Sequence, residues 1–159
     1  MILVTTGTNG APFDRLLREI ERIDFGEELL VQHGPSQIRP SRATCVSFLS
    51  FDALVDAIRS ARLVVTHGGV GSVLISVMQG KRPFVVPRLA RYGEAVDDHQ
   101  LSFARRLDVD GVVKLVADPA GLPDLLVEDV KPVQRRGQPA PRLVRELKEY
   151  FAANGATGG

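Results

Sequence analysis

A glycine-rich segment that contains a histidine, Thr66 to Ser72, is the part of the sequence best suited to chemistry. It follows the apolar run Leu63-Val64-Val65 and precedes an amphipathic stretch, so we expect a strand before it and a helix after it. Glycines let a backbone approach an anion closely, and the free N–H groups and dipole of a first helical turn attract phosphate. The candidates for holding a diphosphate are therefore His67, Gly68, Gly69, Gly71 and Ser72.

The same glycines have a simpler interpretation, in which they only turn a tight corner between strand and helix. The residues alone leave both interpretations open. Two well-known nucleotide-binding loops are excluded. The segment does not end in the Gly-Lys-Ser or Gly-Lys-Thr of a P-loop, and it lacks the Gly-x-Gly-x-x-Gly spacing of a dinucleotide fingerprint.

A second polar cluster, Arg91 to Gln100, follows the next apolar run and stands close to a predicted helix start. Asp97 or Asp98 can cap that helix. His99 and Gln100 would present hydrogen-bonding side chains over the strand ends, where sugar hydroxyls need such partners. A capping box on a solvated helix face explains the two aspartates equally well, which leaves His99 and Gln100 as the candidates for function.

Basic residues stand near the same two loops, namely Lys81, Arg82, Arg88 and Arg91. A guanidinium holds a carboxylate through two parallel hydrogen bonds, so Arg88 and Arg91 are candidates for contacting an acidic sugar. Basic loops that are merely solvated are common, and this alternative stays open.

Positioning these loops requires a scaffold, and the alternation of apolar runs with amphipathic stretches predicts one. We expect strands at 2–6, 29–32, 44–49, 63–66, 83–87 and 112–116, and helices at 13–23, after Ser50, from the glycine-rich segment to Gly80, and at 97–107, 119–126 and 141–153. Such alternation indicates an α/β fold, a Rossmann-like doubly wound parallel sheet whose ligands bind at the carboxyl ends of the strands. Residues 1–153 would form one domain and 154–159 a flexible tail.

Composition sets further limits. The 159 residues include 20 Lys and Arg against 19 Asp and Glu, a net charge of +1, which argues against a nucleic-acid partner. The single cysteine, Cys45, cannot form an intramolecular disulfide and indicates a cytoplasmic protein. The histidines, His33, His67 and His99, show no metal-ligand spacing, so we expect neither a metal nor a cofactor. No apolar run reaches the roughly 20 residues of a membrane span.

Together the two loops resemble the donor-binding half of glycosyltransferase family 28, whose members have the two-domain GT-B fold. The segments that match are 66–72, 80–88 and 98–101, followed by a helix that contains Ala104. The opening Val4-Thr5-Thr6-Gly7-Thr8 is similar to the start of short members in which the donor domain is a separate chain. The Arg91-Tyr92-Gly93-Glu94 insertion is similar to that of PssE-like subunits of bacterial exopolysaccharide glycosyltransferases.

The resemblance implies a UDP-sugar donor, with the diphosphate on the glycine-rich segment and the sugar beside the second polar cluster. The implied donor-binding residues are His67, Gly68, Gly69, Gly71, Ser72, Glu94, Asp98, His99 and Gln100. The cluster of basic residues near the two loops makes Arg88 and Arg91 the candidates for contacting a sugar carboxylate. Such a carboxylate would belong to an acidic sugar such as glucuronate.

One position departs from the family pattern. Many relatives hold the ribose with a glutamate in the helix after the glycine-rich segment, and this sequence has Ile75 there. An isoleucine cannot accept those hydrogen bonds, so the ribose must be held elsewhere, for example by Glu94.

A complete enzyme of this architecture has two domains that face a cleft, and one domain provides only the donor side. The resemblance therefore implies a membrane-anchored partner subunit that binds a lipid-linked sugar acceptor, a polyprenyl-diphosphate sugar, and that carries or completes the catalytic base. The chain would act in exopolysaccharide assembly, recruited by this partner to the inner face of the plasma membrane. Helix 141–153 is the expected docking element, with ordinary core packing as the alternative. The competing function is a non-catalytic nucleotide-sugar-binding or regulatory module.

Overall fold

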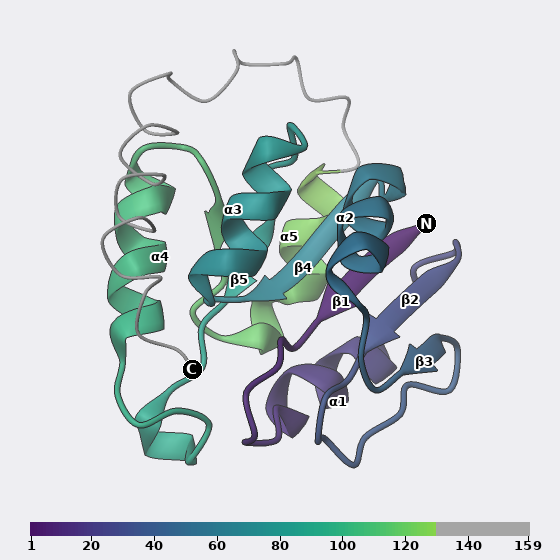
Figure 1. Cartoon of the computed structure of the whole chain (residues 1–159), viewed down its shortest axis with the longest axis horizontal. Helices are drawn as coiled ribbons and strands as arrows, with labels where there is room; N and C mark the ends of the chain where they lie inside the picture. The colour runs from purple at the N-terminus through teal and green to yellow at the C-terminus, as the bar shows by residue number, and fades with distance from the viewer. Residues whose placement is uncertain (130–159) are drawn as a thin grey trace.

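A parallel β-sheet forms the centre of the protein in this computed structural model, which describes residues 1–129 (Figure 1). The six strands are β1 (Ile2–Thr5), β2 (Leu29–Gln32), β3 (Thr44–Val46), β4 (Leu63–His67), β5 (Phe84–Val86) and β6 (Lys114–Leu115). They lie in the order β3-β2-β1-β4-β5-β6, and every neighbouring pair is parallel. In the central strand, Ile2 pairs with Leu29 on one side and with Leu63 on the other.

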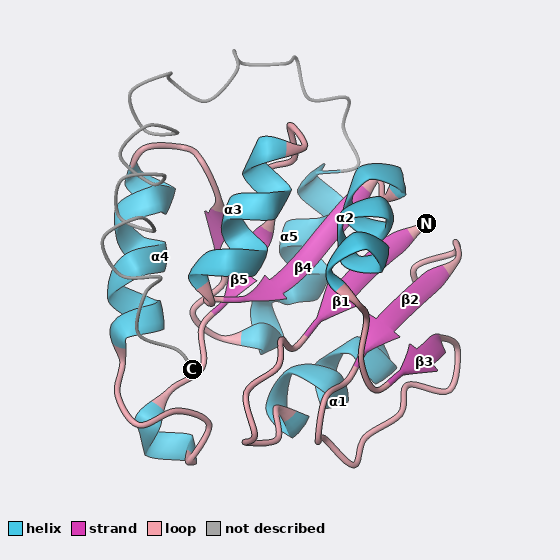
Figure 2. Cartoon of the chain, in the orientation of Figure 1, coloured by secondary structure: helices cyan, strands magenta, loops and turns pink. Residues whose placement is uncertain are grey.

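Helices cover both faces of the sheet and connect its strands, except that a loop joins β2 to β3 (Figure 2). The α-helices are α1 (Asp14–Arg22), α2 (Phe51–Ser60), α3 (Val70–Met78), α4 (His99–Val109) and α5 (Leu122–Asp129), and the two 3-10 turns are η1 (Ala90–Tyr92) and η2 (Pro119–Gly121). This strand order and this alternation confirm the expected Rossmann-like doubly wound α/β fold.

Each face of the sheet has its own apolar core. On one face, α1 and α5 pack against Ile2, Val4 and the residues beside them in neighbouring strands. On the other face, α2 packs against Leu3 and Val64, while α3 and α4 pack against Val85. Successive strand residues point to opposite faces, so a parallel sheet that is covered on both sides needs apolar residues at nearly every strand position.

Several expected boundaries differ from the structure; for example, the strand predicted at 112–116 is only Lys114–Leu115, and the helix predicted at 119–126 divides into η2 and α5. The strand predicted at 44–49 ends at Val46, because the neighbouring β2 ends at Gln32 and the chain then turns at Gly34, whose φ is +57°. The helix predicted from Asp97 begins at His99, and Asp97 instead accepts a hydrogen bond from the His99 N–H at 3.0 Å. The predicted cap Ser50 is confirmed, since its hydroxyl accepts from the Ala53 N–H at 3.3 Å.

Some expectations concern residues outside 1–129. The helix predicted at 141–153, its docking role and the tail 154–159 all lie beyond the described residues. Among residues 1–129, no helix combines the length and the apolar character needed to cross a membrane.

Candidate functional site

The chain reverses its direction of winding between β1 and β4. From β1 it continues to β2 and β3 on one side, and from β4 to β5 and β6 on the other, so the loops after β1 and β4 diverge. Ligands of doubly wound sheets bind in the crevice that such a reversal opens. A pocket of about 250 Å³ lies at this place, lined by Thr5, Gly7, Thr8, Gln32, Leu49, Leu54, His67, Gly71, Ser72 and Ile75.

The imidazole ring of His67, the last residue of β4, lies in space between Gly7 and Gly69. A Cβ atom placed on Gly7 or on Gly69 would overlap its imidazole ring, and Gly7 also has a φ of +76°. Both positions therefore need glycine for the ring to fit. The ring thus separates the loop after β1 from the loop after β4.

Burial controls the charge of His67, which is 8% exposed. Desolvation lowers its pKa to about 4, the nearby positive charge of Arg88 acts in the same direction, and a hydrogen bond with the backbone of Thr5 acts against them. The imidazole is therefore neutral near pH 7. It can offer the site a hydrogen bond but no positive charge.

The first turn of α3 faces the pocket with polar backbone groups. Gly69 is the N-cap and provides no side-chain cap, and the first turn contains no acidic residue. The first N–H groups of a helix have no partner within the helix, and those of residues 70–72 find no acceptor elsewhere within residues 1–129. Gly71 adds room, because a Cβ atom there would meet nothing within 4 Å.

Gln100, in the first turn of α4, joins the loops that follow β4 and β5. Its Oε1 accepts from the Gly68 N–H at 3.1 Å and from the Arg88 N–H at 3.0 Å. The approach is close enough that a Cβ atom on Gly68 would lie 2.7 Å from the Gln100 Cβ. The side-chain NH₂ of Gln100 makes no hydrogen bond within the described part of the chain, which leaves its donors for a ligand.

The structure gives Arg88 and Glu94 partners other than the expected sugar. Arg88 is fully buried, and its guanidinium donates to the carbonyl oxygens of Thr6 and Ala11, both at 2.9 Å, and of Glu94 at 3.2 Å. Burial lowers the pKa of Arg88, and Glu94 opposes this effect. The two terminal nitrogens of the guanidinium make these bonds, while the Nε has no partner within residues 1–129. Arg88 thus holds the loop after β1 against the loop after β5.

Glu94 is 4% exposed and is paired internally. Its carboxylate oxygens each accept from the Arg15 guanidinium at 2.9 Å, and one of them also accepts from the Leu89 N–H at 3.1 Å. Both oxygens are thus engaged by the protein, which leaves them poorly placed for the ribose contact considered from the sequence.

Three other predicted residues lie at the surface. The imidazole of His99 is 88% exposed and its Nδ1 lies 2.6 Å from an Asp97 oxygen, a contact that helps the His99 N–H to lower the pKa of Asp97. Arg91 is exposed, with its guanidinium 4.8 Å from the centre of the Tyr92 ring. Asp98 accepts from the Ala90 N–H at 2.9 Å and so fixes the start of η1.

The sequence patterns did not identify two polar residues that line the base of the pocket, Thr5 and Gln32. Thr5 and Gln32 end β1 and β2, and Leu49, Leu54 and Ile75 form apolar walls beside them. Polar residues at the ends of apolar parallel strands were the signal that could have found Thr5 and Gln32. No group of three or more metal-ligating side chains gathers anywhere in residues 1–129.

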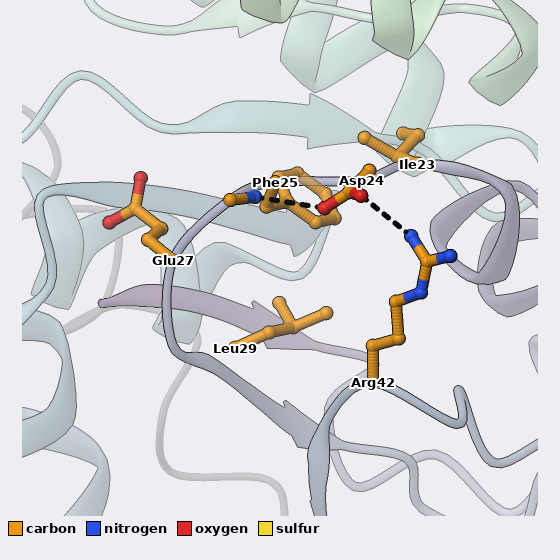
Figure 3. A pocket seen from close by; sticks show the side chains of 7 residues that line it. Ile23, Asp24, Phe25, Glu27, Leu29 and Arg42 are labelled. Atoms are coloured by element: carbon orange, nitrogen blue, oxygen red, sulfur yellow. Dashed lines mark hydrogen bonds and ion pairs between the residues drawn. The ribbon is translucent and has the colours of Figure 1, made fainter.

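A second, smaller pocket of about 170 Å³ lies at the connection between α1 and β2 (Figure 3). It is lined by Ile23, Asp24, Phe25, Gly26, Glu27, Leu29 and Arg42. Leu29 begins β2, so this pocket opens at the amino end of that strand and not at the carboxyl edge. An ion pair of 2.9 Å joins Asp24 and Arg42 across it.

Comparison with known proteins identifies the family. The family described as glycosyltransferase family 28 C-terminal domain matches residues 1–152, and the chain therefore belongs to this family. No curated protein matches the sequence.

Solved structures of glycosyltransferases share the fold. CalG4, the calicheamicin glycosyltransferase, has a TM-score of 0.61 at 17% identity, covering 96% of this chain and 43% of its own. MurG of Acinetobacter baumannii has a TM-score of 0.58 at 19% identity, covering 93% and 49%. VinC, solved in complex with DTDP, has a TM-score of 0.53 at 18% identity, covering 98% and 37%. The chain spans less than half the length of each of these proteins.

Proposed function

We propose that this chain binds the nucleotide-sugar donor of a glycosyltransferase, a UDP-sugar, and that the first turn of α3 holds the diphosphate. The observation that carries the proposal is the set of unpaired N–H groups of residues 70–72, which border the pocket between β1 and β4 in a family 28 domain. The positive end of a helix dipole and free N–H groups both favour a diphosphate. His67, Gly68 and Gly69 shape this loop, and Gly71 and Ser72 line the pocket itself.

The donor sugar then lies on the α4 side of the glycine-rich loop. Gln100 keeps its amide donors there, and the exposed side chains of His99 and Arg91 are within the same polar cluster. For an acidic sugar such as glucuronate, Arg91 is the residue proposed to contact the carboxylate. Arg88, Glu94 and Asp98 support the site from beneath by fixing the loop after β5.

Sugar transfer also requires an acceptor side. We infer that a membrane-anchored partner subunit supplies it, binds a polyprenyl-diphosphate sugar and carries or completes the catalytic base, in exopolysaccharide assembly at the inner face of the plasma membrane. The resemblance to stand-alone donor subunits supports this inference.

Calorimetric titration of the purified chain with UDP tests donor binding. We expect binding to the wild type and its loss in Gly71→Leu, whose side chain would fill the space beside the free N–H groups. Gly121→Leu is the matched control, because a Cβ atom there also meets nothing within 4 Å and Gly121 lies in η2, away from the pocket. No binding of UDP to the wild type, alone or with its partner, would refute the proposal.

Turnover is tested by reconstituting the chain with its partner, UDP-glucuronate or UDP-glucose, and a polyprenyl-diphosphate sugar. Transfer that needs both chains supports the two-component enzyme. UDP binding without transfer by any such pair would favour the non-catalytic binding module. A preference of the wild type for UDP-glucose would remove the acidic sugar and the role of Arg91 from the proposal.

A further inference from the structure

The larger pocket contains a polar side chain that has no role in the donor binding proposed for α3 and α4. Gln32 ends β2, lines the pocket and is only 1% exposed. Its Oε1 accepts from the Thr5 hydroxyl at 2.7 Å. Its NH₂ group makes no hydrogen bond within residues 1–129.

The orientation of this amide follows from its neighbours. The Gly7 N–H donates a hydrogen bond to the Thr5 hydroxyl oxygen at 3.2 Å, and the Thr5 hydroxyl in turn donates a hydrogen bond to Gln32 Oε1. With the amide reversed, the hydroxyl would receive two donors and its proton would have no acceptor. The amide oxygen therefore faces Thr5, and the NH₂ group is left for the pocket.

The walls around this donor are apolar and belong to Leu49, Leu54 and Ile75. An oxygen atom that enters the pocket would give this donor an acceptor, whereas a ligand that lacks one at that point would leave the donor unpaired at a cost in free energy. A neutral donor beside apolar side chains suits an uncharged ring that carries an oxygen acceptor, whereas the N–H groups of α3 in the same pocket suit a phosphate. The isoleucine at position 75 then has a role of its own, because it keeps that wall apolar.

We propose that Gln32 is a specificity-determining residue that donates a hydrogen bond to a neutral oxygen acceptor on the nucleoside part of the donor. The proposal rests on the proposed function, because the first turn of α3 borders the same pocket and would hold the diphosphate of the same molecule. Gln32 acts on the nucleoside alone, whereas the N–H groups of α3 act on the phosphates. A site built to donate rejects a ligand that presents a donor or no polar group at that point.

The test compares UDP with inorganic pyrophosphate by calorimetric titration. Gln32→Glu keeps the shape of the side chain and replaces the donor by an acceptor, and Gln32→Met removes the donor without adding charge. We expect each variant to lose about tenfold or more in affinity for UDP, the effect of leaving an acceptor unpaired in a buried site, and to bind pyrophosphate like the wild type. Gln79→Glu is the control, because Gln79 is the C-cap of α3, is not among the residues that line the pocket, and accepts from Arg59 at 3.3 Å.

The outcomes separate the two proposals. A wild type that binds neither UDP nor pyrophosphate contradicts the proposed function and this inference with it. A wild type that binds UDP, with Gln32 variants that bind it equally well, contradicts the role of Gln32 alone. The same holds for variants that lose UDP and pyrophosphate to the same extent, since that pattern marks a general structural role. Should Gln32→Glu fail to fold because it buries a charge, Gln32→Met decides the question.

Discussion

The pocket at the ends of β1 and β4 and the pocket beside Arg42 have comparable volumes, about 250 and 170 Å³, but are built differently. The first is lined by the ends of three strands, by α3 and by the segment that enters α2. The second is lined by one short stretch, 23–29, together with Arg42 (Figure 3).

The polar groups of the two pockets also differ. In the smaller pocket, the Asp24 carboxylate already accepts from the Gly26 N–H at 3.1 Å and pairs with Arg42, and these two charged side chains are 74% and 66% exposed. In the larger pocket, the NH₂ group of Gln32 and the N–H groups of residues 70–72 have no acceptor within residues 1–129. Unmet hydrogen-bonding capacity, and not volume, thus distinguishes the proposed binding site from the smaller pocket.

The largest effect is expected beneath the larger pocket. Arg88→Met removes the donor to the buried carbonyl oxygen of Thr6 and to the part-buried carbonyl oxygen of Ala11, so the free energy of unfolding should fall by about 3 kcal/mol. Urea denaturation measures this change. Arg18→Met is the control, because Arg18 is exposed and makes no hydrogen bond or ion pair within residues 1–129, so the change should stay within about 0.5 kcal/mol. Equal stability of the two variants would contradict the supporting role of Arg88.

Lowering the pH should reduce the free energy of unfolding, because His67 becomes protonated more readily in the unfolded chain. Its folded-state pKa, about 4, lies below the ordinary value of 6.5, so the unfolded chain binds the proton more readily between these values. Stability is then complete above pH 6.5 and falls as the pH drops toward 4, by up to about 3 kcal/mol. Unfolding at pH 7.5 and pH 4.5 measures the loss, which should be absent from His67→Asn. An identical pH dependence in that variant would show that other groups cause it.

Crowding the imidazole should cost somewhat less. Gly69→Ala places a methyl group where the His67 ring lies, and such overpacking should destabilise the fold by about 1–3 kcal/mol. The double variant His67→Ala, Gly69→Ala should recover much of this loss, because the obstructing ring is gone. Thermal and urea unfolding of the single and double variants, with Gly71→Ala as the unobstructed control, complete the comparison. Strictly additive effects would contradict the contact.

The smallest effect is expected at the smaller pocket. Arg42→Met removes an exposed ion pair, so the free energy of unfolding should change by less than about 1 kcal/mol. UDP affinity, measured by calorimetry, should stay that of the wild type. A marked loss of UDP binding in this variant would reverse the assignment of roles to the two pockets.

The strands and the doubly wound fold could be predicted from the sequence because the patterns that encode them are local. Runs such as Leu63-Val64-Val65 and the Ser50 cap act within a few residues, and both are present in the structure. The glycine-rich segment was likewise recognisable at the strand-to-helix junction.

Arg88 and Glu94 show why the rest was not predictable. An arginine and a glutamate in a loop are usually solvated, and their burial here depends on Thr6, Ala11 and Arg15, which lie more than seventy residues earlier. The amide of Gln32 is also hidden in the sequence, because its orientation depends on a hydroxyl that lies 27 residues away.

The separation of these residues along the chain has a thermodynamic consequence. Thr5, Gln32 and His67 meet only when β1 pairs with both β2 and β4, so the pocket does not exist in a chain whose sheet has opened. Anything that binds there is therefore linked by mass action to global folding and raises the melting temperature of the whole sheet. A ligand at one hundred times its Kd would add about 2.7 kcal/mol to the free energy of unfolding. Thermal shift thus offers a direct screen for the occupant of this pocket.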